Sequence, residues 1–107
     1  MFAQERRIRT TRDIISVLRR GNRRSLGVVA CSFLRKPATL SRVAVIVDNK
    51  VSKKAVVRNL LKRRVRAVLE QHSLPSGDII IRLYKGADAL SFEQLQEQVL
   101  QCLKRTI

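Results

Sequence analysis

The stretch 42–70 reads RVAVIVDNKVSKKAVVRNLLKRRVRAVLE and predicts a strand followed by a helix. Its first segment, RVAVIVD (42–48), is rich in β-branched residues, which favour strands. Because five successive positions are apolar, we expect this strand in the centre of a sheet, covered on both faces. From Ser52 or Lys53 to about His72 the apolar residues recur with helical period, which predicts a long amphipathic helix.

The predicted helix has two faces of opposite character. At about 100° per residue, one apolar arc is expected to pack on the sheet. This arc consists of Val57, Leu61, Val65 and Val68. The opposite arc is polar and cationic, and it consists of Arg58, Asn59, Lys62, Arg63 and Arg66. Arg58, Lys62 and Arg66 are spaced i, i+4, i+8, so their charges follow one line at roughly 6 Å intervals, comparable to the spacing of phosphates along a nucleic-acid strand.

Two further strands and a first helix are predicted around this unit. A helix over 11–20 is indicated by Thr11 as a possible N-cap and by Gly21 just past two Arg residues. GVVACSFLR (27–35) and DIIIRLY (78–84) have the composition of strands.

A last helix is predicted to open at Ser91, whose spacing to Gln94 fits a capping box. The side chains expected to point inward from it are those of Phe92, Leu95, Val99, Cys102 and Leu103. The resulting order α, β, β, α, β, α predicts an α+β sandwich formed by one domain, residues 1–107.

Composition supports a folded protein of the cell interior. The 107 residues include 45% apolar side chains, enough for a core without disulfides or metals. No segment approaches the ~18 uninterrupted apolar residues of a membrane-spanning helix, and the N-terminal sequence is too polar for a secretory signal. We therefore expect a cytoplasmic protein.

Charge is concentrated in one part of the chain. The net charge is +15, and residues 1–66 hold 19 of the 23 Lys and Arg side chains but only three of the eight acidic ones. Between Lys50 and Arg66, eight of 17 residues are basic and none is acidic. Such a concentration indicates a polyanion or an anionic membrane surface as the partner.

The sequence offers little for protein-based catalysis. Cys31 and Cys102 are isolated in apolar stretches and are expected to be reduced core thiols. The lone His72 lies in EQHSLPSG, which marks the end of a helix. A self-sufficient metal nuclease would need clustered carboxylates, whereas Asp48, Asp78 and Asp88 are single acids in separate segments. We expect no catalytic residue and no metal site in the protein itself.

Several interpretations of the cationic helix are open at this point. A solvated helix face is the simplest, but the absence of acidic partners at i, i+4 argues against it. A helix that lies on a membrane surface or docks into a groove is expected to carry a bulky aromatic side chain on its apolar face. The apolar face of this helix has only Val and Leu. DNA binding remains open, although no recognition-helix turn, zinc-finger spacing or heptad repeat is visible.

The stretch 42–70 resembles the signature of the bacterial ribonuclease P protein component. That pattern is an apolar strand, a short basic turn, and a helix carrying Arg-Asn-Arg, then Lys-Arg and a further Arg. Arg58 and Asn59 match its first two positions, and Lys62, Arg63 and Arg66 match the later ones. RRIRTTRDIISVLRRGNR is similar to the opening helix of the family, and DIIIRLYKGADALSFEQLQEQVLQCLKR to its last strand, loop and helix. The resemblance covers nearly the whole chain.

This resemblance implies a fold like the second domain of a small-subunit ribosomal protein. Its sheet is mostly antiparallel and contains a left-handed βαβ crossover, which general rules would make right-handed. It also implies that the protein binds the large catalytic ribonuclease P RNA, with Mg²⁺ bound mainly by that RNA, and takes no small-molecule substrate. The implied RNA-binding residues are Lys50, Lys53, Lys54, Arg58, Asn59, Lys62, Arg63, Arg64 and Arg66. The 5′ leader of precursor tRNA would lie in a cleft between the first helix and the sheet, lined by Ile14 and Leu18.

The sequence departs from the family pattern in three regions. Leu60 takes the third place of Arg-Asn-Arg, and Arg64, one turn later, occupies a usually apolar place, which suggests that the guanidinium has moved one turn. The first helix has Ile14 and Leu18 where the family presents aromatic rings, so weaker stacking on leader bases is expected. The turn 48–50 is Asp-Asn-Lys where the family has Ser or Ala and two Lys. The alternative is a ribosomal or ribosome-assembly RNA-binding protein of similar fold. The uneven charge distribution taken alone agrees equally well with that alternative.

Overall fold

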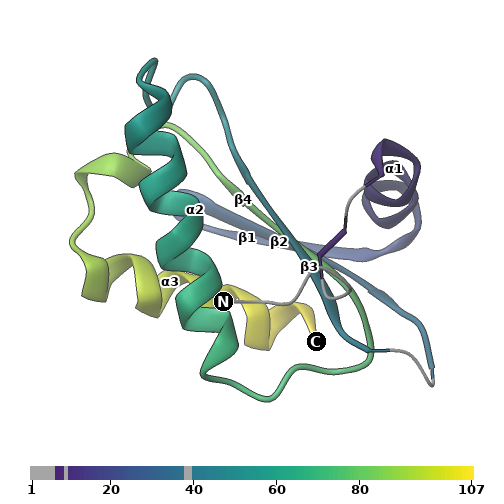
Figure 1. Ribbon diagram of the computed structural model, residues 1–107. Coiled ribbons are helices and arrows are strands. Elements are labelled where there is room, and N and C mark those ends of the chain that lie inside the picture. Colours follow the sequence, from purple (N-terminus) through teal and green to yellow (C-terminus); the bar gives the residue numbers. More distant parts are fainter. Residues whose placement is uncertain (1–6, 9, 38–39) are drawn as a thin grey trace.

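The computed structural model describes residues 7–8, 10–37 and 40–107 and is a layered α+β structure (Figure 1). Its elements are α1 (Thr11–Arg20), β1 (Asn22–Leu26), β2 (Val29–Arg35), β3 (Arg42–Val47), α2 (Ala55–Glu70), β4 (Gly77–Leu83), the short 3-10 helix η2 (Ala87–Ala89) and α3 (Phe92–Thr106). Helices α2 and α3 lie on one face of the sheet, and α1 lies on the other. The predicted α+β class is confirmed.

The sheet has four strands in the order β1-β2-β4-β3. β1 with β2 and β2 with β4 are antiparallel, while β3 and β4 are parallel. α2 therefore forms the connection of a βαβ crossover, as the resemblance implies, and the left hand of this crossover stays a prediction. β1 was not predicted: its sequence NRRSL is polar and largely exposed, so it lacks the apolar pattern of a strand.

The predicted central position of the 42–48 strand is wrong. β3 lies at the edge of the four-stranded sheet, and β4, with Ile79, Ile80 and Ile81 fully buried, lies between β2 and β3. β3 is nevertheless apolar on both sides, because α2 covers one face and the α1 side covers part of the other. Its outer edge is also partly occupied, since the Ile8 N–H donates to the Val43 carbonyl at 2.9 Å. A continuous apolar run thus indicates that both faces of a strand are covered by other elements, and it does not indicate whether the strand is central or at the edge of the sheet.

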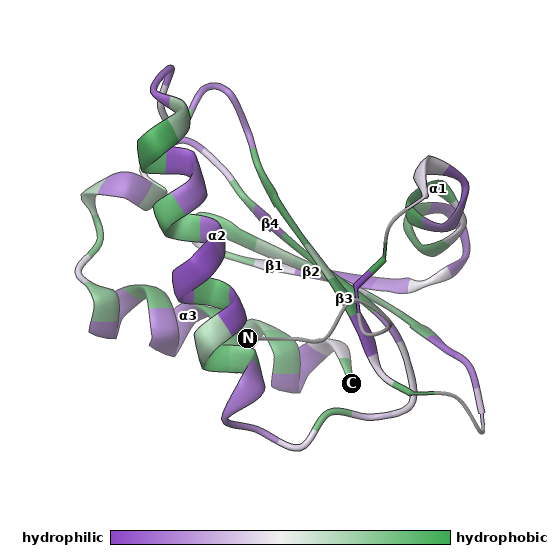
Figure 2. Ribbon diagram, in the orientation of Figure 1, coloured by the Kyte–Doolittle hydropathy of each residue, from purple (hydrophilic) through white to green (hydrophobic). Residues whose placement is uncertain are grey.

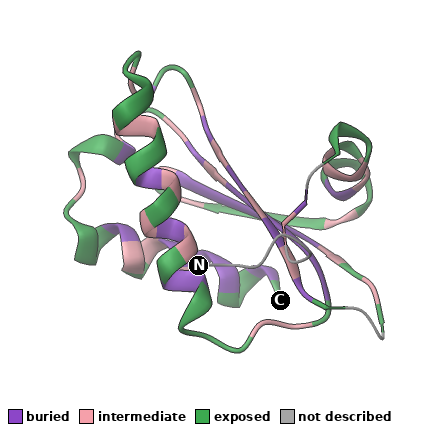
Figure 3. Ribbon diagram, viewed as in Figure 1, coloured by how far each residue is buried: buried purple, intermediate pink, exposed green. Residues whose placement is uncertain are grey.

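The main core lies between the sheet and the pair α2 and α3. Every second residue of β2, β3 and β4 points into it, and the predicted arc of α2 is confirmed, with Leu61, Val65 and Val68 buried and Val57 packed at its edge. Figure 3 shows this division, with the inner sides of α2 and α3 buried and most of α1 exposed. In Figure 2, α2 alternates between hydrophobic and hydrophilic segments, as expected of a helix with one face on a sheet.

Helix α3 begins as predicted, with one correction. Ser91 and Gln94 form the capping box, in which the Gln94 N–H donates to Ser91 Oγ and the Ser91 N–H donates to Gln94 Oε1. Phe92, expected to point inward, is 42% exposed, because it is the first residue of the helix and precedes the segment that lies on the sheet. Cys31 and Cys102 are buried free thiols, as predicted.

Helix α1 packs on the opposite face through a small second core. Val17 is fully buried against Ile8 and Ile80, with Ile14 partly buried beside them. The helix spans the predicted residues, but its N-cap is Thr10 and not Thr11: the Thr10 hydroxyl accepts a hydrogen bond from the Asp13 N–H. Gly21 ends the helix where a Cβ atom would lie 2.6 Å from two backbone carbonyl oxygens, so only glycine lets the chain turn this closely into β1.

Candidate nucleic-acid interface

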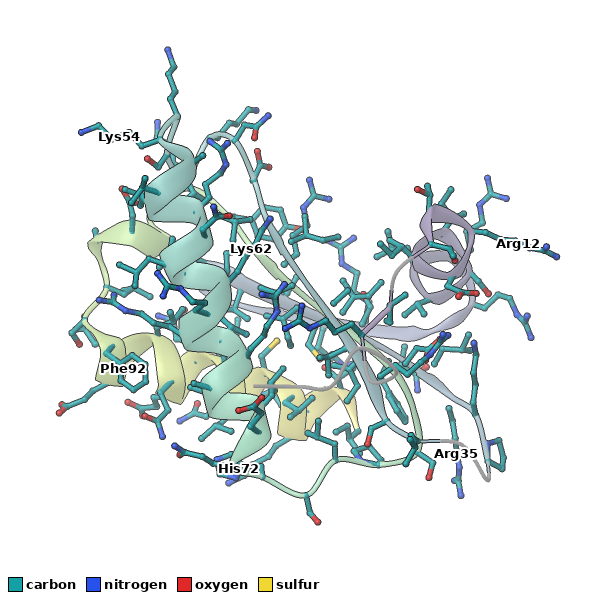
Figure 4. The ribbon with its side chains drawn as sticks, viewed as in Figure 1. Arg12, Arg35, Lys54, Lys62, His72 and Phe92 are labelled. Carbon is teal, nitrogen blue, oxygen red and sulfur yellow. The ribbon has the colours of Figure 1, made fainter. Side chains whose placement is uncertain are left out.

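Basic side chains cover the outward side of α2 and the turn that precedes it. Asn59 and Arg63 are exposed on the side directly opposite the core, while Arg58, Lys62 and Arg66 are half-buried along one flank. Lys50, Lys53 and Lys54 are exposed in the preceding turn, and Figure 4 shows Lys54 projecting from that end of the helix. The ion pairs seen among the described residues involve other cations, namely Lys36, Arg42 and Arg82. The predicted cationic surface is therefore exposed at the turn and on the outward face of α2 and half-buried along its flanks.

Arg58 has a structural role besides its charge. Its Nη1 donates to the Ser52 carbonyl at 2.8 Å, and the Ser52 hydroxyl accepts from the Lys54 N–H at 3.1 Å. The N-cap of α2 is Lys54, whose side chain carries no acceptor for the first N–H groups of the helix. Arg58 and Ser52 thus hold the basic turn against the start of α2, which is why the helix begins at Ala55 and not at residue 52 or 53.

The flank of α2 that carries Arg66 faces the edge of the sheet. Burial is the main cause that lowers the pKa of Arg66, and the nearby charge of Arg7 lowers it further. Arg7 pairs with Val43 on the outer edge of β3, so this flank of α2 lies toward β3. The charges of Arg7 and Arg66 therefore act on each other and add to the positive potential of this flank, which favours an anionic partner.

Arg64 lies on the opposite flank from Arg66. At 100° per residue, Leu60 and Arg64 are neighbours and share the side that faces away from the Arg58, Lys62 and Arg66 line. Leu60 is 38% exposed and Arg64 is half-buried. Leu60 and Arg64 therefore lie on one side of the helix, as predicted. The nine residues predicted to bind RNA are divided among the turn before α2, the outward face of the helix and its two flanks.

The turn 48–51 is ordered by Asp48. Its Oδ1 accepts from the Lys50 N–H at 3.1 Å, its Oδ2 lies 3.4 Å from Arg82 Nη2, and its carbonyl accepts from the Val51 N–H. The Lys50 N–H is the main cause that holds the pKa of Asp48 below its ordinary value, and Arg82 lowers it further. Asp48 thus stays ionised and shapes the turn that exposes Lys50.

A second site lies on the opposite face, between α1 and the sheet. A hollow there is lined by Leu18, Arg23, Ala30, Ser32, Arg82 and Tyr84. Leu18 is 42% exposed at this hollow, whereas Ile14 packs into the small core with Val17 and Ile80. Of the two residues predicted to line a leader cleft, Leu18 lines this hollow and Ile14 packs against the small core, and leader binding there stays a prediction.

Sequence reasoning missed five residues of this hollow, the small Ala30 and the four side chains with polar groups, Arg23, Ser32, Arg82 and Tyr84. Arg23 belongs to the strand that was not predicted, and it pairs directly with Ser32. Arg82 and Tyr84 alternate with the buried Ile81 and Leu83, so they point to the α1 side. The sequence feature that could have revealed Arg82 and Tyr84 is the end of DIIIRLY, where these two residues alternate with the apolar Ile81 and Leu83.

An ion-pair network around Asp78 ties α1 to the sheet. Asp78, 1% exposed, accepts hydrogen bonds from Arg42 Nε and Nη2, both at 2.8 Å, and forms an ion pair with Lys36 at 2.7 Å. Arg42 Nη2 also lies 3.4 Å from Asp13 Oδ2 of α1. Burial acts to raise the pKa of Asp78, but the hydrogen bonds and charges of Arg42 and Lys36 together outweigh it and leave this pKa below its ordinary value.

Within the described ranges, no group of three or more His, Cys, Asp or Glu side chains could hold a metal ion. Over the same residues, no helix has the length and apolar content needed to cross a membrane. His72 lies just past the end of α2, as predicted, and is exposed (Figure 4).

Comparison with known proteins identifies the family. The family model described as Ribonuclease P matches residues 2–107. The chain belongs to the ribonuclease P protein family. The ribonuclease P protein component of Clavibacter michiganensis subsp. michiganensis is 33% identical over 111 residues, covering 100% of this chain and 97% of that protein. The ribonuclease P protein component of Picosynechococcus sp. is 34% identical over 107 residues, covering 97% of this chain and 89% of that protein.

Solved structures of ribonuclease P proteins share the fold. The protein from Thermotoga maritima matches with a TM-score of 0.82 at 26% identity, covering 92% of this chain and 96% of that one. The protein from Staphylococcus aureus matches with a TM-score of 0.85 at 21% identity, covering 94% of each chain. Membership in the family makes this chain a protein subunit of ribonuclease P, which acts in tRNA 5′ processing.

Proposed function

We propose that the whole chain acts as a single RNA-binding domain that holds the catalytic RNA of ribonuclease P on its α2 side and the 5′ leader of precursor tRNA on its α1 side. The observation that carries this proposal is the exposed cationic surface of residues 50–66, which contains eight basic and no acidic side chains. Each phosphate that a Lys or Arg neutralises releases counterions, so such a surface binds a polyanion strongly at low salt.

The contacts of three aspartates support a protein that binds and an RNA that cleaves. Asp78 is engaged by Arg42 and Lys36, Asp48 by the Lys50 backbone N–H and Arg82, and Asp13 by Arg42. These groups serve as anionic partners of cations within the fold, so they do not fit a protein-held Mg²⁺ site. In this proposal Mg²⁺ is bound mainly by the RNA, and the protein supplies positive charge that lets the RNA and its substrate approach one another.

The α1 side supports binding of a single strand. The hollow between α1 and the sheet combines an aliphatic wall, an aromatic ring and two guanidinium groups, which suit the bases and phosphates of unpaired RNA. We place the 5′ leader there, and we place the protein in the bacterial cytoplasm, where precursor tRNA is made.

The test is reconstitution with a bacterial ribonuclease P RNA at low Mg²⁺. We expect the purified protein to cleave no precursor tRNA by itself, and to restore cleavage at the mature 5′ end to an RNA that is nearly inactive under these conditions. Cleavage by the protein alone, surviving removal of nucleic acid and abolished by changing an Asp, would overturn the proposal. So would tight binding to ribosomal RNA with no stimulation of the ribonuclease P RNA.

A further inference from the structure

The aromatic ring in the hollow under α1 is held in a defined orientation. Tyr84 follows β4, and its hydroxyl accepts a hydrogen bond from Arg23 Nη2 at 2.7 Å. The Arg82 guanidinium carbon lies 5.1 Å from the centre of the Tyr84 ring, within the range of a cation–π contact. Arg82 is in turn anchored by Asp48, 3.4 Å from its Nη2. Tyr84 is therefore fixed at its hydroxyl by one cation and at its ring by a second.

Small side chains leave space beside this ring. Ala30 pairs with Arg82 across β2 and β4, and Ser32 pairs with Arg23 across β1 and β2, so both small residues lie on the floor of the hollow. Leu18 of α1, 42% exposed, lines the same hollow. The result is an open recess with an aromatic ring, an aliphatic side chain and two cationic groups at its wall.

We propose that Tyr84 is the base-stacking residue of this recess: an unpaired nucleobase stacks on its ring beside Leu18, and Arg23 and Arg82 contact the phosphates that flank that base. The inference rests on the proposed function, in which the strand is the 5′ leader. Stacking on an aromatic ring tolerates any base, whereas aliphatic residues alone would give a weaker platform. The subsite selects unpaired RNA, because a base in a duplex cannot expose its face to the ring.

The hydrogen bond from Arg23 makes a purely structural role for Tyr84 the competing explanation. The two roles differ in what a Tyr84→Phe variant does. Phe lacks the hydroxyl and breaks the bond to Arg23, but it keeps the ring face. A stacking residue is therefore replaced well by Phe and badly by Leu, whereas a residue that serves only to hold Arg23 is replaced badly by both.

The chain offers a direct spectroscopic test, because Tyr84 is its only Tyr and it contains no Trp. Tyrosine fluorescence of the full protein thus reports on this one residue. We expect a short single-stranded RNA of leader sequence to quench it, and the same RNA annealed to its complement to leave it unchanged at equal concentration. A parallel titration of free tyrosine amide corrects for absorption by the RNA. Equal quenching by single strand and duplex would overturn the proposal.

Affinity measurements on variants complete the test. In the reconstituted enzyme, Tyr84→Leu should weaken binding of precursor tRNA about 5- to 150-fold, which corresponds to the ~1–3 kcal/mol of one stacked base. Binding of mature tRNA should not change, and Tyr84→Phe should bind precursor like the wild type. The matched control is Phe92→Leu, which removes an exposed ring on the other face of the sheet and should have no effect.

The failures of the two proposals are distinguishable. If the wild-type enzyme does not prefer precursor over mature tRNA, the placement of the leader on the α1 side fails. If that preference is present and Tyr84→Leu keeps it while circular dichroism shows a folded protein, the stacking role fails. If Tyr84→Leu does not fold, the quenching of the wild type and the affinity of Tyr84→Phe still decide the question.

Discussion

Arg58 of α2 has two roles that the sequence alone does not distinguish: it adds positive charge to the predicted RNA-binding surface, and it stabilises the turn before the helix. Arg63 is exposed on the outward face, whereas Arg58 also donates to the Ser52 carbonyl and holds the basic turn. Both residues were predicted to bind RNA from charge and spacing. The second task of Arg58 depends on where the chain turns before the helix, which no periodicity reveals.

This difference predicts distinct results for two alanine variants. A plot of log affinity against log salt concentration has a negative slope. Arg63→Ala should make this slope less steep by about 1, because one phosphate contact is lost, and should leave the stability unchanged. Arg58→Ala should make the slope less steep by the same amount and also reduce the unfolding free energy by about 1 kcal/mol, because a hydrogen bond is lost. Salt titrations of RNA binding and urea unfolding measure both quantities.

The control for these variants is Lys104→Ala, which removes an exposed cation from α3 and should leave the slope unchanged. Asn59→Ala should weaken RNA binding without changing the slope, because it removes hydrogen bonds and no charge. Equal slopes for wild type, Arg58→Ala and Arg63→Ala would place the RNA elsewhere on the protein.

Asp78 predicts how stability depends on pH. Its pKa is below the ordinary value in the folded protein, so the unfolded chain binds the proton more readily. The stabilisation from Asp78 is therefore complete above the unfolded pKa of about 3.9 and is lost as the pH falls from there through the lower folded pKa. Asp78→Asn should be less stable at neutral pH and should show a smaller loss of stability on acidification. An unchanged acid profile in chemical unfolding would contradict this role.

At the scale of elements, α1 is the least firmly attached helix. Val17 is its only buried residue, and the pair between Asp13 and Arg42 ties it to the charged cluster around Asp78. The position of α1 sets the opening of the recess that contains Tyr84 and Leu18. Attachment of this helix and access to the recess are therefore coupled.

Asp13→Asn should loosen this attachment. We expect a reduction of up to about fivefold in the preference for precursor over mature tRNA, since a partly exposed ion pair contributes about 0.2–1 kcal/mol. Affinity for the ribonuclease P RNA should match that of Asp88→Asn, a control with the same charge change in η2. Precursor preference equal to that of Asp88→Asn would show that the pair does not position α1.

The elements were predictable where the hydrophobic pattern is clear, as for α1, α2, β4 and α3, and the capping box at Ser91 also fixed the start of α3. β1 was missed because NRRSL has no apolar alternation and forms a strand only through its pairing with β2. The edge position of β3 was missed because an apolar run is the same for any strand covered on both faces. The cationic side of α2 follows from one helical period, whereas the recess requires residues from α1, β1, β2 and β4 to meet, which only the fold brings about.

At the scale of the whole molecule, the sheet separates two surfaces. α2 and its basic turn lie on one face, and the recess under α1 lies on the other (Figure 1). The turn 48–51 joins them, because Asp48 shapes the turn beside Lys50 and also contacts Arg82 of the recess. In the proposed function, the two surfaces would let the protein contact the ribonuclease P RNA and the leader at the same time.

Because both native cysteines are buried, a cysteine introduced on the surface can be labelled selectively, and the label can report which RNA lies near each face. Burial raises the pKa of Cys31 to about 12, and Cys102 is also buried with a raised pKa, so neither should react with thiol reagents in the folded protein. A cysteine introduced at an exposed position can therefore carry an iron chelate alone. The wild-type protein, taken through the same labelling, is the control and should produce no cleavage.

The decisive measurement is strand cleavage by iron attached at Arg63→Cys or at Leu18→Cys in the assembled complex with precursor tRNA. Iron at position 63, on the outward face of α2, should cut the ribonuclease P RNA and leave the leader intact. Iron at position 18, at the recess, should cut the 5′ leader. Cleavage of the leader from position 63, or of the ribonuclease P RNA alone from position 18, would contradict the assignment of the two faces.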